Sequence, residues 1–192
     1  MEEKSSQSVK LSSLKPHFLF NALNSVKCEV ISDASDKVDL LDDFAAYLRY
    51  ILNNNVISAK EIVAFLGSYI RLEEARYDQI RIIFEVETLH FQMEALTLFE
   101  LIYNAIHHGL GGNAPDGKVW VRIQKGKGEV IIEIEDNGKG ISKEAYQKAY
   151  EEKRSLFQIK ESMENRGGSF HIDTMEKRGS TIYLVIPDTI LC

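Results

Sequence analysis

The chain has 192 residues, 44% of them hydrophobic, which is enough for a globular core in one large or two small domains. Its formal net charge of -6 argues against electrostatic binding to nucleic acid or to an anionic membrane face, so a nucleotide or another protein is the more natural partner. The polar start MEEKSSQSVK is unlike a signal peptide, and no apolar run approaches the length of a membrane span. The two cysteines, Cys28 and Cys192, lack metal-type spacing and suit a reducing compartment. We therefore expect a cytoplasmic protein, or the cytoplasmic portion of a longer membrane sensor, with no membrane contact by this chain itself.

Two N-terminal segments carry apolar residues at helical spacing. The first runs from Leu14 to about Ile31, and the second follows the break SDASD as KVDLLDDFAAYLRYILNN. Together they predict a helical hairpin within residues 1–57. Two helices bury too little surface to be stable by themselves, so the apolar stripe needs a partner. A second copy of the chain, completing a dimeric four-helix bundle, is the economical partner, and the rest of the same chain is the alternative.

Residues 58–192 have the pattern of a second domain that mixes helices and strands. Ser58 and Glu61 have the spacing of a capping box and open a helix that runs to about Tyr77. The elements expected after it, in chain order, are a strand at Ile80 to Glu87, a helix at Phe91 to His108, paired strands KVWVRIQ and EVIIEIED, helices near Lys143 to Tyr150 and Ser155 to Asn165, and strands GSFHIDTM and STIYLVIP. This order predicts an α+β fold, in which the hairpin is followed by a two-layer α/β sandwich with a mostly antiparallel sheet.

Polar side chains are spaced four, three and one residues apart in the expected helix ELIYNAIHHG. We interpret them as lying on one side of that helix: Glu100, Asn104, His107 and His108. A single helical asparagine is more often a surface or cap residue than a ligand. Its candidacy improves if a second motif follows in the right order.

That second motif is IEDNGKGI, in which Asp136 ends a strand and Gly138 and Gly140 follow. A carboxylate there can accept a hydrogen bond from an exocyclic amine, and glycines let the backbone approach a flat base. Near the C-terminus, RGSTIYLVIP adds Gly179 and Thr181 at the start of a final strand. Each motif is weak by itself, so the signal lies in their combination.

The combination resembles known families. Three elements, in order, resemble the N, first-glycine and final GT elements of the Bergerat ATP-binding fold of GHKL ATPases and histidine kinases: Asn104, Asp136 with Gly138 and Gly140, and Gly179 with Thr181. LKPHFLFNALNSV resembles the phosphoacceptor motif P-H-F-x-F-N-x-L-N of LytS-type sensor histidine kinases, and YIRLEEARYDQIRIIFEVE is similar to their connecting segment. The resemblance runs from Leu14 to Pro187.

This resemblance implies a sensor histidine kinase core that acts as a homodimer, uses ATP with Mg²⁺, and passes a phosphoryl group to the receiver domain of a response regulator. His17 would accept the γ-phosphoryl group and Asn21 would support it from one helical turn on. Asn104 would hold Mg²⁺, and Asp136 would bind the adenine amine. The full set of expected nucleotide-binding residues is Asn104, His107, His108, Asp136, Gly138, Gly140, Lys153, Arg154 and Thr181.

The second glycine-rich loop of the family is missing, because KRSL places Lys153 and Ser155 where glycines are expected. Without glycines the backbone cannot easily form a nest of N–H groups around phosphates, although side-chain cations could neutralise them instead. The cations in question are Lys139, Lys143, Lys153 and Arg154. The departure leaves open a degenerate, kinase-like scaffold or phosphotransfer protein with weak or no ATP binding.

Glu100 keeps a second alternative open. It stands four residues before Asn104, where anti-sigma-factor serine kinases and related ATPases have a general base. A lone helical glutamate is more often a surface charge, so Glu100 has little weight as a catalytic residue.

Overall fold

The computed structural model describes residues 56–187 except 78, 95, 112–113 and 153. The predicted helical hairpin, with His17 and Asn21, falls outside these residues and stays a prediction. The predicted boundary between the two domains at residues 57 and 58 also stays a prediction.

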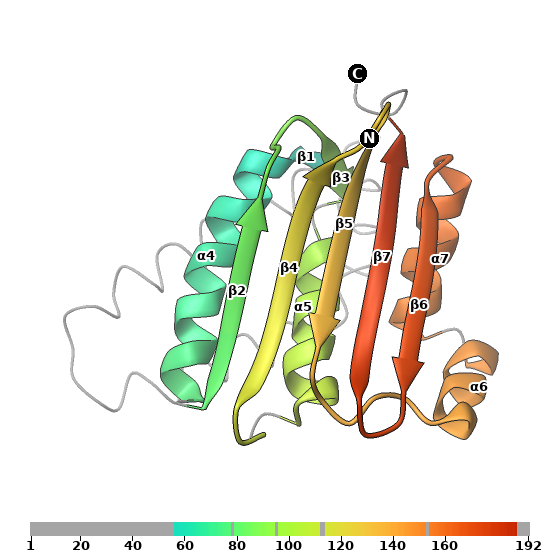
Figure 1. Ribbon diagram of the computed structural model, residues 1–192. Coiled ribbons are helices and arrows are strands. Elements are labelled where there is room, and N and C mark those ends of the chain that lie inside the picture. The colour runs from blue at the N-terminus through green and yellow to red at the C-terminus, as the bar shows by residue number, and fades with distance from the viewer. Residues whose placement is uncertain (1–55, 78, 95, 112–113, 153, 188–192) are drawn as a thin grey trace, which may run out of the picture.

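In the described part of the chain, five strands form one mixed sheet (Figure 1). They are β2 (Ile80–Val86), β4 (Gly117–Lys125), β5 (Glu129–Asp136), β7 (Gly179–Pro187) and β6 (Ser169–Met175), given in their order across the sheet. β2 pairs parallel with β4, and the other three pairs are antiparallel, which confirms the expected mostly antiparallel sheet.

Helices cover one face of this sheet, which confirms the two-layer sandwich. α4 (Ala59–Arg76), α5 (Thr97–Asn104) and α7 (Ser155–Asn165) lie behind the strands in Figure 1, and α6 (Lys143–Glu151) lies at the end of the sheet beside the β6–β7 turn. None of the residues of α6, all of them described, is buried. Among the described helices, none combines the length and the apolar character needed to cross a membrane.

The capping box predicted at the start of α4 is present. The Ser58 hydroxyl accepts a hydrogen bond from the Glu61 N–H at 3.4 Å, and the Glu61 carboxylate accepts one from the Ser58 N–H at 3.0 Å. These reciprocal bonds satisfy two backbone donors that a helix start otherwise leaves without partners.

The expected helix from Phe91 to His108 is wrong at its start, while its end agrees to within one residue with the observed helical segment, which ends at Gly109. Residues Gln92–Glu94 form strand β3, which pairs antiparallel with β1 (Val56–Ser58). Phe91 and Met93 are buried and Gln92 between them is exposed, which is the period of two of a strand. At the other end, α5 gives way to a π-helical segment, η1 (Ala105–Gly109).

The alternation of β5 carries one polar side chain into the layer between sheet and helices. Val130, Ile132 and Ile134 are buried in the core, and Asp136 continues the same inward series at the end of the strand. Buried helical residues face them, among them Leu98, Leu101 and Ile102 of α5. Asp136 is therefore directed into the molecule by the same periodicity that builds the core.

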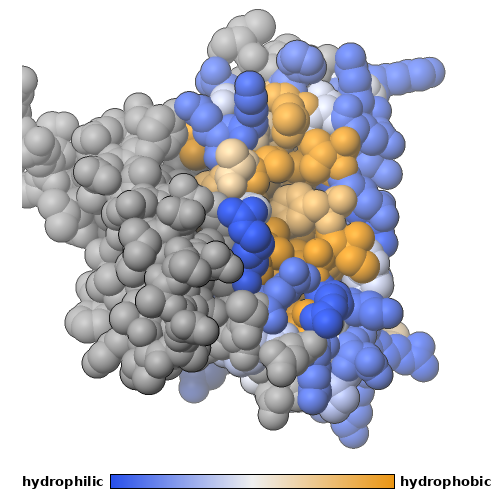
Figure 2. Space-filling model, turned by 90° about the vertical axis from the view of Figure 1, so that its left-hand side faces the viewer, coloured by the Kyte–Doolittle hydropathy of each residue, from blue (hydrophilic) through white to orange (hydrophobic). Residues whose placement is uncertain are grey.

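The β2 edge has a different surface. Figure 2 looks onto this side of the molecule and shows apolar side chains gathered beside hydrophilic ones. Ile83 and Val86 of β2 belong to the exposed large hydrophobic residues, while Arg81 and Glu85 alternate charge along the same strand. Charged residues on an edge strand discourage pairing with other strands.

Candidate functional site

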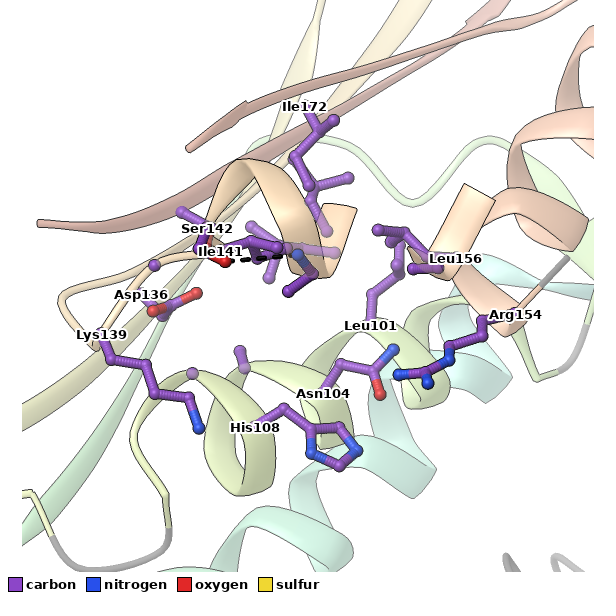
Figure 3. Close-up of a pocket in the computed structure, with 18 of the residues that line it drawn as sticks. Leu101, Asn104, His108, Asp136, Lys139, Ile141, Ser142, Arg154, Leu156 and Ile172 are labelled. Atoms are coloured by element: carbon purple, nitrogen blue, oxygen red, sulfur yellow. Dashed lines mark hydrogen bonds between the residues drawn. The ribbon is translucent and has the colours of Figure 1, made fainter. Parts of the chain in front are cut away.

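A cavity of about 600 Å³ opens between α5, η1, the loop after β5, α6 and the ends of β6 and β7 (Figure 3). This volume lies in the range of pockets that hold small organic ligands. Much of the wall is apolar, and these side chains suit the two faces of a flat ring system: Leu101, Ile134, Ile141, Leu156, Ile172 and Ile182.

Asp136 supplies a buried acceptor to this apolar wall. Its side chain is 7% exposed, and its Oδ1 accepts a hydrogen bond from the Gly138 N–H at 2.9 Å. Burial raises the pKa of Asp136 to about 6, while the backbone N–H groups of Gly138 and Ser180 oppose that rise. A carboxylate in this position can accept one further hydrogen bond from a ligand.

The backbone packs closely around Asp136. A Cβ on Gly109 would lie 2.7 Å from the Asp136 Oδ1, so a side chain at that position would displace the carboxylate. Gly140 has a φ of 66°, and a Cβ there would lie 2.1 Å from the Met175 carbonyl oxygen. The loop after β5 is also bound on both sides, because the Lys139 N–H donates to the Gly109 carbonyl at 3.0 Å and the Lys177 N–H donates to the Lys139 carbonyl at 2.6 Å.

Polar and cationic side chains gather along one side of the pocket. Figure 3 shows Lys139, His108, Asn104 and Arg154 in a row, with Ile172 across the pocket from them. They come from the loop after β5, from η1, from α5 and from the residue before α7. Such a row suits an anionic group, because side-chain cations can neutralise phosphate without a backbone nest.

The pocket brings together several of the predicted site residues: Asn104, His108, Asp136, Gly140 and Arg154. Gly138 lies in the same loop and holds the Asp136 carboxylate without lining the wall. Lys153 falls outside the described residues.

His107 does not lie where the sequence predicts it, and the interpretation of a shared helix side is wrong for this residue. In η1 the Leu110 N–H donates to the Ala105 carbonyl at 2.8 Å, five residues back, so the helix has more residues per turn than an α-helix. Because of this wider turn, His108 lines the pocket together with Asn104. The His107 ring instead faces α4, where its Nε2 lies 3.4 Å from the Glu73 Oε1. Glu100 is half-buried and does not belong to the pocket wall.

Thr181 also does not line the pocket. Ser180 and Ile182 do, and Thr181 alternates with them, paired with Glu135 across β5 and β7. Sequence reasoning missed Ser180, although a signal for it was present. In STIYLVIP every second residue from Ser180 onward is a buried one, namely Ile182, Leu184 and Ile186. This alternation places Ser180 on the inward face of the strand.

The β6–β7 turn was missed altogether. Glu176 and Lys177 both line the pocket, and nothing in the sequence pattern places this turn beside the loop after β5. Within the described ranges, no three His, Cys, Asp or Glu side chains gather in a way that could hold a metal ion.

The raised pKa of Asp136 predicts a pH-dependent stability. The unfolded chain ionises this group near its ordinary value of 3.8 and the folded chain near 6, so folding favours the neutral carboxyl. The stabilisation that comes from the neutral Asp136 carboxyl is fully present below pH 3.8 and is lost as the pH rises through 6. Relative to Asp136→Asn, wild-type stability should fall by about 2 kcal/mol between pH 4 and pH 7. Urea denaturation at both pH values measures this change, with Asp173→Asn on an exposed strand position as control. A difference that does not vary with pH would contradict the prediction.

Two family profiles match the chain. Residues 7–81 match the family described as histidine kinase, and residues 95–190 match the family described as histidine kinase-, DNA gyrase B-, and HSP90-like ATPase. The second match covers half of the chain and contains the residues of the pocket described above.

Relatives of known sequence agree with these matches. The chain is 30% identical to the protein YwpD of Bacillus subtilis over 142 residues, which is 69% of this chain and 50% of YwpD. It is 29% identical to the sensor histidine kinase BtsS of Escherichia coli over 65% of this chain and 23% of BtsS. It is 27% identical to the sensor protein LytS of Bacillus anthracis over 92% of this chain and 33% of LytS. The chain therefore spans half or less of the length of these relatives.

Solved structures show the same fold. The histidine kinase domain of a blue-light activated kinase from Erythrobacter litoralis aligns with a TM-score of 0.55 at 16% identity, over 96% of this chain and 92% of that one. The histidine kinase ThkA, solved in complex with the response regulator protein TrrA, aligns with a TM-score of 0.55 at 16% identity, over 98% of this chain and 66% of that one.

Proposed function

The chain belongs to the LytS-type sensor histidine kinases with an HSP90-like ATPase domain, and from this membership we propose that it is a kinase core that phosphorylates itself on His17. In this proposal it binds Mg-ATP in the pocket around Asp136 and donates the phosphoryl group to a response regulator. The observation that carries the proposal is the pocket itself, in which a buried acceptor lies in an apolar wall beside a row of cations.

The pocket chemistry suits ATP at both of its ends. Asp136 can accept the hydrogen bond of the adenine amine, and the apolar walls can hold the two faces of the base. Lys139 and Arg154 supply positive charge for the phosphates in place of a second glycine loop. Asn104 would hold the Mg²⁺ that accompanies the nucleotide, and this ion would neutralise charge on the transferred group.

The phosphoryl acceptor in this proposal is His17, which lies outside the described residues. A neutral imidazole has a nitrogen lone pair that can attack the γ-phosphorus, forming an N–P bond as the bond to the β-phosphate oxygen breaks and ADP leaves. Asn21, four residues on, can bind the other ring nitrogen through its side-chain amide. Phosphoryl transfer depends mainly on positioning and charge neutralisation, so the chemistry needs few further groups.

Two partners belong to the proposal. A second copy of the chain would cover the apolar stripe of the predicted helical hairpin, giving a homodimer. An aspartate of a response regulator would take the phosphoryl group from His17. The ThkA structure, a histidine kinase in complex with a response regulator protein, supports a partner of this class.

Incubation of the chain with γ-labelled ATP and Mg²⁺, with the response regulator omitted, tests the proposal. The expected product carries a protein-bound phosphate that is labile in acid and stable in alkali, as a phosphoramidate is. A chain that takes up no label would be the degenerate scaffold, and an acid-stable label would indicate the serine-kinase alternative. The serine-kinase alternative relies on Glu100 as a general base, and the position of Glu100 outside the pocket wall argues against it.

A further inference from the structure

Behind the nucleotide pocket, α4 and the α5–η1 helix enclose a buried carboxylate. Glu73 of α4 is 1% exposed, and its Oε1 lies 3.4 Å from the Nε2 of His107. The His107 ring packs at 4.2 Å from the Tyr103 ring, and Tyr77 approaches it edge-on at 6.0 Å. Among the described residues the second oxygen of Glu73 has no hydrogen-bond partner. His107 and the Tyr69 phenol, which also interacts with this carboxylate, are thus the polar groups recorded beside Glu73 in the described part of the chain.

The burial of Glu73 makes its contact with His107 important for the stability of this part of the fold. A buried carboxylate is costly unless a cation or hydrogen-bond donor compensates it, and removing one partner of such a pair leaves the other uncompensated. Three tyrosines lie beside the pair: Tyr69 of α4, Tyr77 directly after α4, and Tyr103 of α5. Burial first, and the nearby Glu73 carboxylate second, raise the pKa of the Tyr69 phenol well above its ordinary value. His107 is the basic side chain whose contact with Glu73 is recorded, at 3.4 Å.

His107 belongs to the segment that forms the pocket wall on its other side. Ala105, His108 and Gly109 of η1 line the pocket, and Asn104 directly precedes them. π-helical turns are uncommon and less regular than α-helix, and they often occur at functional sites. The contact between His107 and Glu73 therefore also fixes the direction of the side chains on the pocket side of this segment, Asn104 and His108.

We propose that Glu73 is a positioning residue for nucleotide binding. By pairing with His107 it holds η1 in its π-helical phase, so that Asn104 and His108 face the phosphates of ATP. The inference rests on the proposed function for its nucleotide, and it gives His107 a role different from the direct phosphate contact expected from the sequence. It also makes α4, which follows the predicted phosphoacceptor hairpin in the chain, part of the support of the ATP site.

Two measurements on the full chain test this role. Amide hydrogen exchange of residues 105–110 in nucleotide-free protein reports on η1, and calorimetric titration with Mg-ATP reports on the pocket. Glu73→Gln keeps the shape and removes the charge, and it should speed exchange in η1 and weaken ATP binding, each by about 10-fold, as expected for loss of a hydrogen bond to a charged group. Exchange in β4 and β5 should not change. His107→Ala should reproduce both effects, and His107→Lys, which retains a cation opposite Glu73, should restore both to within about threefold.

Glu161→Gln, at an exposed position of α7, is the matched control and should change neither measurement. Unchanged exchange in both Glu73→Gln and His107→Ala would overturn the proposal, as would a His107→Lys variant that behaves like His107→Ala. If Glu73→Gln fails to fold, the two His107 variants carry the same test. If the wild-type chain binds no ATP, the proposed function fails, while the exchange of η1 still decides whether Glu73 holds this segment.

Discussion

Replacing Asp136 by asparagine is expected to weaken the binding of Mg-ATP by about 100-fold, within the range for loss of a hydrogen bond to a charged group. The side chain is buried, and backbone N–H groups of Gly138 and Ser180 already point at its carboxylate. An asparagine has one acceptor oxygen, so satisfying these donors turns its NH₂ group toward the ligand or toward another donor. Either arrangement removes the acceptor that the adenine amine needs.

Calorimetric titration with Mg-ATP measures this loss, and Asp173→Asn serves as the control because Asp173 lies exposed on β6, away from the pocket. The same variant should narrow the preference for ATP over GTP, because guanine presents a carbonyl oxygen where adenine has its amine. Wild-type affinity for ATP in Asp136→Asn would show that the base is not bound at this carboxylate.

His17→Gln is expected to abolish phosphorylation and leave ATP binding unchanged. Glutamine is similar in length and polarity, but its amide nitrogen lone pair is delocalised and cannot attack phosphorus as an imidazole nitrogen can. The nucleotide pocket is built from residues between Leu101 and Ile182, so its affinity should not depend on His17. The change should therefore separate binding from chemistry.

Labelling with γ-labelled ATP, together with titration of the same preparation, checks both halves of this expectation. His90→Gln is the matched control, because His90 is exposed in the segment between β2 and β3 and is remote in sequence from the acceptor motif. Label that persists in His17→Gln would place the acceptor elsewhere. Loss of ATP binding in the same variant would mean that His17 helps to form the pocket.

Strand periodicity accounts for most of what the sequence predicts correctly. The inward series that ends in Asp136 identifies both a core strand and the acceptor of the site, because alternation places every second residue on one face. The start of α4 is equally local, since a capping box depends on two residues three apart. Features of this kind need no knowledge of the neighbouring elements.

The predictions that are wrong depend on tertiary structure. The π-helical phase of η1 cannot be seen in ELIYNAIHHG, because an α-helical reading fits the same letters, and the difference appears only where His107 meets Glu73 on another helix. Strand β3 has three residues and is recognisable from its pairing with β1. Lys177 enters the pocket because a distant hairpin turn packs against the loop after β5.

The lack of buried residues in α6 has a consequence for access to the pocket. Ala145 and Ala149 of this helix form part of the pocket wall, yet the helix contributes nothing to the core that supports the sheet. Its recorded ring contacts are those of Tyr146 and Tyr150 with Phe157 of α7, so its detachment should cost less apolar burial than unfolding of the sheet. In the proposed function, nucleotide can therefore enter and leave the pocket through displacement of α6, while the sheet and the loop after β5 stay in place.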